Sequence, residues 1–233
     1  MSAAPGTPGI APVGLRDVTV WDPLLRLTHW SFALLIPAMW WTAENSKWAL
    51  HRRLGLVLLG LLVFRVLWGF LGPHTARFAQ FVNGPRTVVA YLKGQWAQAA
   101  THIGHSPLGG WSTLALIGVM LAQVTMGLFA GDPYDGMTGP LNPLVGVMLA
   151  DTITELHETF FWVVVGFVGL HLSAIAFYGA RGDDLLSPML SGNRPPMQGV
   201  AGIGPMPWGR ALIAVAAAAG FAGWIAAGAP PLT

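Results

Sequence analysis

The sequence predicts an all-α membrane protein, a bundle of transmembrane helices, and composition and segment length are the observations that predict it. Of its 233 residues, 54% are hydrophobic and 9% are charged, whereas about 25% of the residues of a soluble domain are charged. The apolar residues gather in runs of about 20, the length of a helix that crosses a bilayer. These runs lack the alternation of apolar and polar residues that marks the strands of outer-membrane barrels.

Five apolar segments are long enough to span the membrane. They cover residues 24–43, 49–71, 108–130, 152–178 and 208–229. The expected organisation is therefore a tail (1–23), a four-helix domain (24–178), a polar linker (179–207) and an additional C-terminal transmembrane helix (208–229). The tail lacks the charged start and apolar stretch of a cleavable signal peptide, so we expect it to be retained.

The distribution of lysine and arginine predicts the orientation of these spans. With a cytoplasmic N-terminus, eight of these residues face inward (Arg16, Arg26, Arg77, Arg86, Lys93, Arg181, Arg194 and Arg210) and three face outward (Lys47, Arg52 and Arg53). Because cytoplasmic loops carry an excess of lysine and arginine, we expect the N-terminus and the linker inside and the C-terminus outside. The charges are too scattered to form a nucleic-acid-binding stripe, and membrane lipid is the expected surroundings.

Histidines within the predicted spans are the candidate functional residues. The chain has no cysteine, which removes thiolate metal sites, iron–sulfur clusters and covalent haem attachment. Ionisable residues inside a membrane are costly and are functional candidates by default. By depth along the predicted helices, His29 matches His171 on the inner side, and His51 matches His157 on the outer side.

His157 and His171 share the fourth predicted span and are fourteen residues apart. This spacing brings the two side chains to within about 40° of the same helix face and separates them by roughly 21 Å along the axis. Two facing histidines at each depth suit axial ligation of non-covalent haem. The sequence thus predicts a transmembrane, haem-binding helical bundle with histidine ligands at two depths. Two protein ligands per iron leave no position for dioxygen, which indicates electron transfer.

Arg65 and His105 are further candidates for cofactor binding on the inner side. Arg65 follows His51 by fourteen residues, and its guanidinium could bind a haem propionate or a quinone carbonyl; alternatively, it extends to the cytoplasmic headgroups. His105 precedes the third span and could bond a propionate or exchange protons with a quinone. Its alternative is a cap at the start of that helix.

Four motifs resemble the bacterial cytochrome b561 family, which includes the b-type cytochrome subunits of nickel–iron hydrogenases and stand-alone dihaem cytochromes b. The motifs are RLTHW (26–30), ALHRRLGLVLLGLLVFRVLWG (49–69), IGHSPLGGW (103–111) and ELHETFFWVVVGFVGLHLSAI (155–175). The resemblance extends from about Val18 to Arg194, in motif order and spacing.

The resemblance implies two b haems stacked across the bacterial inner membrane, with His29 and His171 on the iron of the inner haem and His51 and His157 on that of the outer one. Family members pass electrons between the quinone pool and a partner outside the cytoplasm. The expected function is therefore a respiratory electron-transfer subunit whose partner is a dehydrogenase or hydrogenase subunit or a cytochrome c. Family bundles usually stop after the fourth helix, so the fifth leaves the partner open.

Two other functions remain open. One is a stand-alone oxidoreductase that passes electrons from superoxide at the outer face to ubiquinone. The other, from a different class, is a non-redox transporter of metal ions or protons that uses the same histidines. A visible spectrum would separate both redox functions from the transporter.

Overall fold

Five long helices dominate the computed structural model, which describes residues 17–95, 104–132, 137–195 and 202–232. The long helices are α1 (Pro23–Glu44), α2 (Trp48–Leu71), α5 (Pro107–Phe129), α6 (Val147–Ala180) and α8 (Trp208–Ala226). Most of the predicted tail and the middle of the predicted linker lie outside the described residues.

Short elements connect the long helices. They are η1 (His74–Ala76), α3 (Phe78–Phe81), α4 (Pro85–Leu92), η2 (Asn142–Leu144) and α7 (Leu186–Ser191). Strand β1 (Val18–Thr19) pairs antiparallel with β4 (Asn193–Arg194), and β2 (Gly131–Asp132) pairs antiparallel with β3 (Met137–Thr138). The first pair ties the segment before α1 to the segment after α7.

Side-chain caps fix where two of the long helices begin. The Asp22 carboxylate accepts hydrogen bonds from the backbone N–H groups of Leu24 and Leu25 at the start of α1. The Ser106 hydroxyl accepts one from Gly109 at the start of α5. Both helices carry a proline in the first turn, where its missing N–H is tolerated.

Four of the described helices are long and apolar enough to cross a membrane, namely α2, α5, α6 and α8. Helix α8 is the least apolar of them. Helix α1 has 22 residues, enough for a span of about 33 Å, but it contains Arg26, His29 and Pro37 and is not among the four. A fifth span at α1 therefore stays a prediction.

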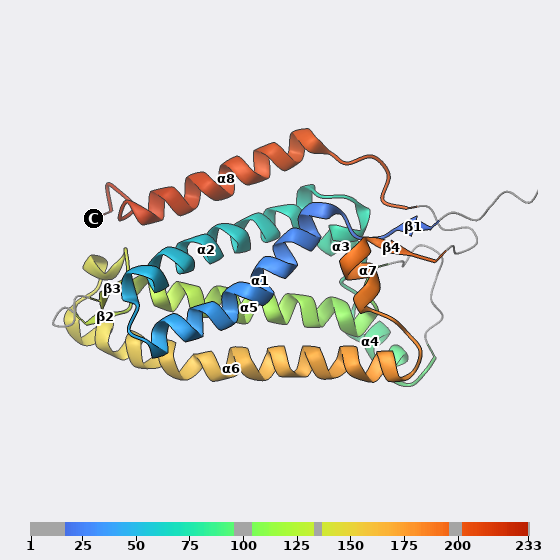
Figure 1. Ribbon diagram of the computed structural model, residues 1–233, viewed down its shortest axis with the longest axis horizontal. Coiled ribbons are helices and arrows are strands. Elements are labelled where there is room, and N and C mark those ends of the chain that lie inside the picture. Colours follow the sequence, from blue (N-terminus) through green and yellow to red (C-terminus); the bar gives the residue numbers. More distant parts are fainter. Residues whose placement is uncertain (1–16, 96–103, 133–136, 196–201, 233) are drawn as a thin grey trace, which may run out of the picture.

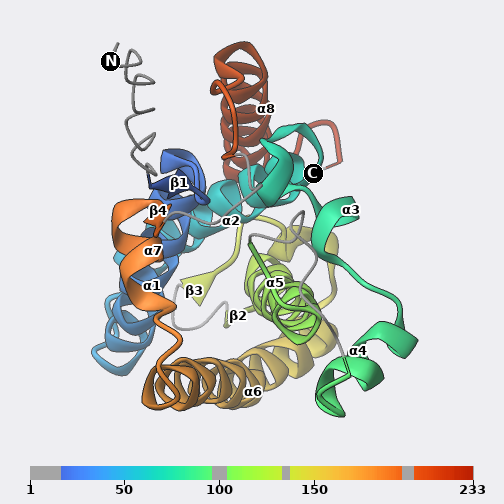
Figure 2. The same ribbon diagram turned by 90° about the vertical axis from the view of Figure 1, so that its right-hand side faces the viewer.

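Helices α1, α2, α5 and α6 are arranged around a common axis (Figure 2), and α8 lies outside α2. The main helix contacts are α1 with α2, α2 with α5, α5 with α6, and α2 with α8. In both views α8 and α6 lie on opposite sides of the bundle. Helix α6 exposes most of its apolar side chains, as expected of a surface that faces lipid.

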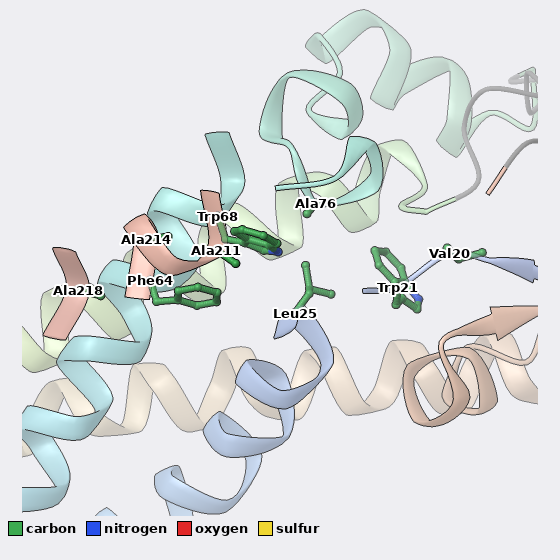
Figure 3. Packing of buried hydrophobic residues seen from close by; sticks show 9 residues of the cluster. All are labelled: Val20, Trp21, Leu25, Phe64, Trp68, Ala76, Ala211, Ala214 and Ala218. Carbon is green, nitrogen blue, oxygen red and sulfur yellow. The ribbon is translucent and has the colours of Figure 1, made fainter. Parts of the chain in front are cut away.

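Small residues on α8 let it approach α2 closely. Figure 3 shows the buried cluster where the two helices meet the start of α1; it contains Val20, Trp21, Leu25, Phe64, Trp68, Ala76, Ala211, Ala214 and Ala218. A Cβ atom on Gly60 of α2 would lie 3.6 Å from that of Ala222. Such small-residue faces are typical of packed membrane helices, so α8 has a partner within its own chain.

The start of one helix differs from the sequence prediction. Helix α6 begins at Val147, before the predicted residue 152, directly after the extended residue Gly146. The polar connection after α2 forms η1, α3 and α4. Pro85 occupies the first turn of α4, where the missing N–H of proline costs no helix hydrogen bond.

Candidate functional site

The structure places the four span histidines in two facing pairs. The rings of His29 on α1 and His171 on α6 have centroids 6.2 Å apart, with their planes inclined by 58°. The rings of His51 on α2 and His157 on α6 are also 6.2 Å apart, at 88°. We call the first pair the inner pair and the second the outer pair, after the sides expected from the sequence. Helix α6 supplies one member to each.

Backbone carbonyls orient both rings of the outer pair. His157 Nδ1 lies 2.9 Å from the carbonyl oxygen of Gln123 on α5. His51 Nδ1 lies 3.1 Å from the carbonyl oxygen of Met39 on α1 and 3.1 Å from Thr42 Oγ1. Because a carbonyl oxygen can only accept, each Nδ1 carries the proton, and each Nε2 keeps an open lone pair.

Ring packing surrounds the inner pair. His29 Nδ1 is buried and has no hydrogen-bond partner among the described residues. The Trp30 ring meets the His29 ring edge to face, with centroids 5.2 Å apart. The Trp30 indole N–H in turn donates to the carbonyl of Met189 on α7, at 3.2 Å. Helix α7 thus anchors the α1 turn that carries His29.

Both pairs fit a metal ion held between two imidazoles. A metal about 2 Å from each nitrogen, together with an imidazole radius of roughly 1.1 Å, places the two ring centroids about 6 Å apart. The observed 6.2 Å in both pairs agrees with this, and the open Nε2 atoms of the outer pair are suitable donors. Among the described residues, no group of three or more metal-binding side chains gathers at one place, so these histidines form pairs only.

Arg65 is buried within the fold, with 6% of its surface exposed. Its guanidinium carbon lies 5.1 Å from the centroid of the Phe78 ring, and its Nη1 has no hydrogen-bond partner among the described residues. The nearby Asp22 carboxylate stabilises its charge. That carboxylate also accepts a hydrogen bond from the Trp68 indole N–H, at 3.1 Å.

His105 lies between two aromatic rings near the start of α5. The centroid of its ring is 4.8 Å from that of Trp21 and 4.2 Å from that of Phe81, and its buried Nδ1 has no partner in the described part of the chain. Burial, with the positive charge of Arg65, lowers the pKa of His105 to about 3. The ring is therefore neutral at neutral pH. Ser106, and not His105, caps the helix.

Sequence reasoning missed the groups that hold the outer pair. The sequence did contain a sign that Gln123 contacts a functional residue: it is an amide within an apolar span, and Gly127 follows four residues later on the same helix face. The backbone carbonyls of Met39 and Gln123 could not be singled out from the sequence, because every residue has a backbone carbonyl. Glu155 and Glu158 beside His157 are exposed.

Four long apolar helices, with facing histidine pairs at two levels of the bundle, define a multi-pass membrane protein. A family model described as prokaryotic cytochrome b561 matches residues 20–192, and the chain belongs to this family. Membership and the four apolar helices make it a multi-pass membrane protein, and the family suggests electron transfer by b-type haem. The match ends before α8. No curated protein and no solved structure matches the chain.

Proposed function

We propose that this protein carries electrons across the bacterial inner membrane through two haem b groups, and so couples the quinone pool to a redox partner outside the cytoplasm. The inner pair, His29 and His171, would hold one haem, and the outer pair, His51 and His157, the other. The observation that supports this best is the equal 6.2 Å separation of the two pairs.

The histidines bind and orient the cofactor. Haem, when bound, supplies a reversible one-electron couple at its iron. His51 and His157 present Nε2 to the site because carbonyl oxygens hold Nδ1–H on the opposite side of each ring. Two histidines per site would leave no ligand position for dioxygen, so such a site would favour electron transfer over oxygen chemistry.

Helix α6 fixes the distance between the two sites. His157 and His171 are fourteen residues apart within one uninterrupted helix, which separates them by roughly 21 Å. A rigid helix keeps this separation constant, so electrons can pass between the levels without a moving carrier.

Unpartnered polar atoms near the inner side support a contact with an anionic or carbonyl group. Arg65 Nη1 is a buried donor without an acceptor, and His105 Nδ1 is a buried ring nitrogen without a partner among the described residues. A haem propionate or a quinone carbonyl would satisfy them. His105 would act by hydrogen bonding, because a pKa of about 3 keeps its ring neutral at neutral pH, with a proton on one nitrogen only.

The partner we propose is an extracytoplasmic dehydrogenase or hydrogenase subunit or a cytochrome c. This follows the predicted orientation, with a cytoplasmic N-terminus and a periplasmic C-terminus. The alanine face of helix α8 packs on α2, so this face is already covered within the chain. Affinity purification from the native membrane tests the proposal, because a co-purifying redox subunit supports it and a chain isolated alone with quinone reductase activity favours the superoxide alternative.

A haem assay of the purified protein tests the electron-transfer role. We expect low-spin b-haem bands and about two haems per chain in a pyridine-haemochrome assay. His171→Ala should remove the inner haem and His157→Ala the outer one, while His74→Ala, in η1, should retain both. A colourless protein, or one whose spectrum is unchanged in both ligand variants, would rule out the proposal.

A further inference from the structure

Two hydrogen bonds in opposite directions join Gln123 of α5 to His157 of α6. The carbonyl oxygen of Gln123 accepts from His157 Nδ1 at 2.9 Å. The Gln123 side-chain Nε2 donates to the carbonyl oxygen of His157, also at 2.9 Å. The first bond holds the ring and the second holds the backbone that carries the ring. One residue of α5 therefore fixes both parts of His157.

Gly127, one turn further along α5, lies against the same ring. A Cβ atom at this position would come within 2.9 Å of His157 Cε1, 3.4 Å of Nδ1 and 3.5 Å of Nε2. Any side chain here would therefore displace the imidazole. Glycine weakens a helix interior, and the close approach of the ring gives a packing reason for it. Gly118 on the same helix has nothing within 4 Å of such a Cβ.

We propose that Gln123 and Gly127 are positioning residues for His157. Gln123 sets the tautomer and holds the ring toward α5, and Gly127 provides the space that the ring occupies. Neither residue has a counterpart at His29, whose Nδ1 has no partner among the described residues. The inference rests on the proposed function, since it concerns how one haem ligand is held.

The arrangement has an electronic consequence for the outer site. An imidazole that donates Nδ1–H to a carbonyl is a more basic metal ligand, and a more basic ligand favours the oxidised metal. The bond to Gln123 therefore lowers the midpoint potential of the outer haem. A methyl group at residue 127 would push the ring off α5 and weaken both this bond and the alignment with His51.

The test compares Gly127→Ala with the matched control Gly118→Ala in the purified full-length protein. We expect Gly127→Ala either to lose one of two haems in a pyridine-haemochrome assay or to raise the midpoint potential of one haem in a redox titration. The other haem should keep its potential, and Gly118→Ala should match the wild type. A Gly127→Ala protein with two haems and both potentials unchanged would overturn the inference.

Gln123→Leu provides a second measurement that does not depend on overpacking. It removes the side-chain bond to the His157 backbone but keeps the carbonyl acceptor, so we expect a smaller rise in the potential of the same haem. If Gly127→Ala fails to fold, Gln123→Leu decides: a shift confined to the outer haem supports the inference, and unchanged potentials overturn it. A wild-type protein without haem would instead overturn the proposed function.

Discussion

The inner and outer histidine pairs have the same ring separation but different surroundings. Hydrogen bonds from Nδ1 to backbone carbonyls of α1 and α5 orient the outer pair. In the inner pair, His29 packs against Trp30 and its Nδ1 is unpartnered among the described residues. Buried polar groups, Arg65, Asp22 and His105, interact with one another in the inner half of the bundle. The same ring separation is thus maintained by hydrogen bonds to backbone carbonyls in the outer pair and by ring packing around His29 in the inner pair.

This difference predicts unequal redox potentials at the two sites. The hydrogen bonds to His51 and His157 would make these side chains more basic ligands and so favour oxidised iron in the proposed outer site. A buried cation such as Arg65 favours the reduced state of a cofactor near it. We therefore expect the outer haem to have the lower midpoint potential, and the following experiments test that contrast.

The largest expected effect is the loss of a whole haem from one pair. His29→Ala and His171→Ala should each remove the inner haem, because one remaining imidazole cannot hold both sides of the iron. His51→Ala should likewise reproduce the loss caused by His157→Ala. Haem content and the potential of the remaining haem measure this. If His29→Ala and His51→Ala leave the same haem behind, the pairing is wrong.

A smaller effect is expected from Asp22→Ala, which removes a buried carboxylate at the inner end. The change deletes the cap of α1 and the acceptor of the Trp68 indole N–H. Together these losses should lower the free energy of unfolding by about 2 kcal/mol. Thermal unfolding in detergent measures it, with the exposed Asp17→Ala as the control. Equal melting temperatures for the two variants would show that the inner end does not depend on this carboxylate.

The next effect is a pH dependence that arises from His105. Its pKa is about 3 in the folded chain but about 6.5 in an unfolded one. Between these values only the unfolded chain binds the proton, so stability is lost as the pH falls from 7 toward 4, by at most about 1.4 kcal/mol per pH unit. His105→Phe should flatten this slope in thermal unfolding at several pH values. A variant with the wild-type slope would assign the dependence to other groups.

The smallest effect is expected from Thr42→Val in the outer half. This substitution preserves shape but removes the hydroxyl that lies 3.1 Å from His51 Nδ1. Losing about 0.5 kcal/mol of hydrogen bonding should raise the potential of the outer haem by roughly 20 mV. Redox titration measures the shift, and Thr113→Val on α5 is the matched control. A shift of the inner haem instead would contradict the assignment of His51.

Sequence predicted the long helices and the grouping of the histidines, because apolar runs and helical spacing are local properties. The fourteen-residue spacing of His157 and His171 requires only that their segment be one helix, as it is. The supports of the outer pair could not be predicted in this way. The closeness of Gly127 to His157 depends on where α5 crosses α6, and the burial of Arg65 depends on Phe78 folding back over it. Both are tertiary properties.

The positions of the two histidines along α6 determine how much of the transmembrane voltage would fall between them. The helix has 34 residues, with His157 ten residues from its first residue and His171 nine from its last, so the two histidines lie nearly symmetrically about its middle. Their separation of roughly 21 Å is about two-thirds of a hydrocarbon core of ~30 Å. In the proposed function, an electron that passed between the two levels would cross most of the electric field, worth about 1.5 kcal/mol per 100 mV. The driving force between the two proposed haems would then depend on the membrane voltage as well as on their midpoint potentials.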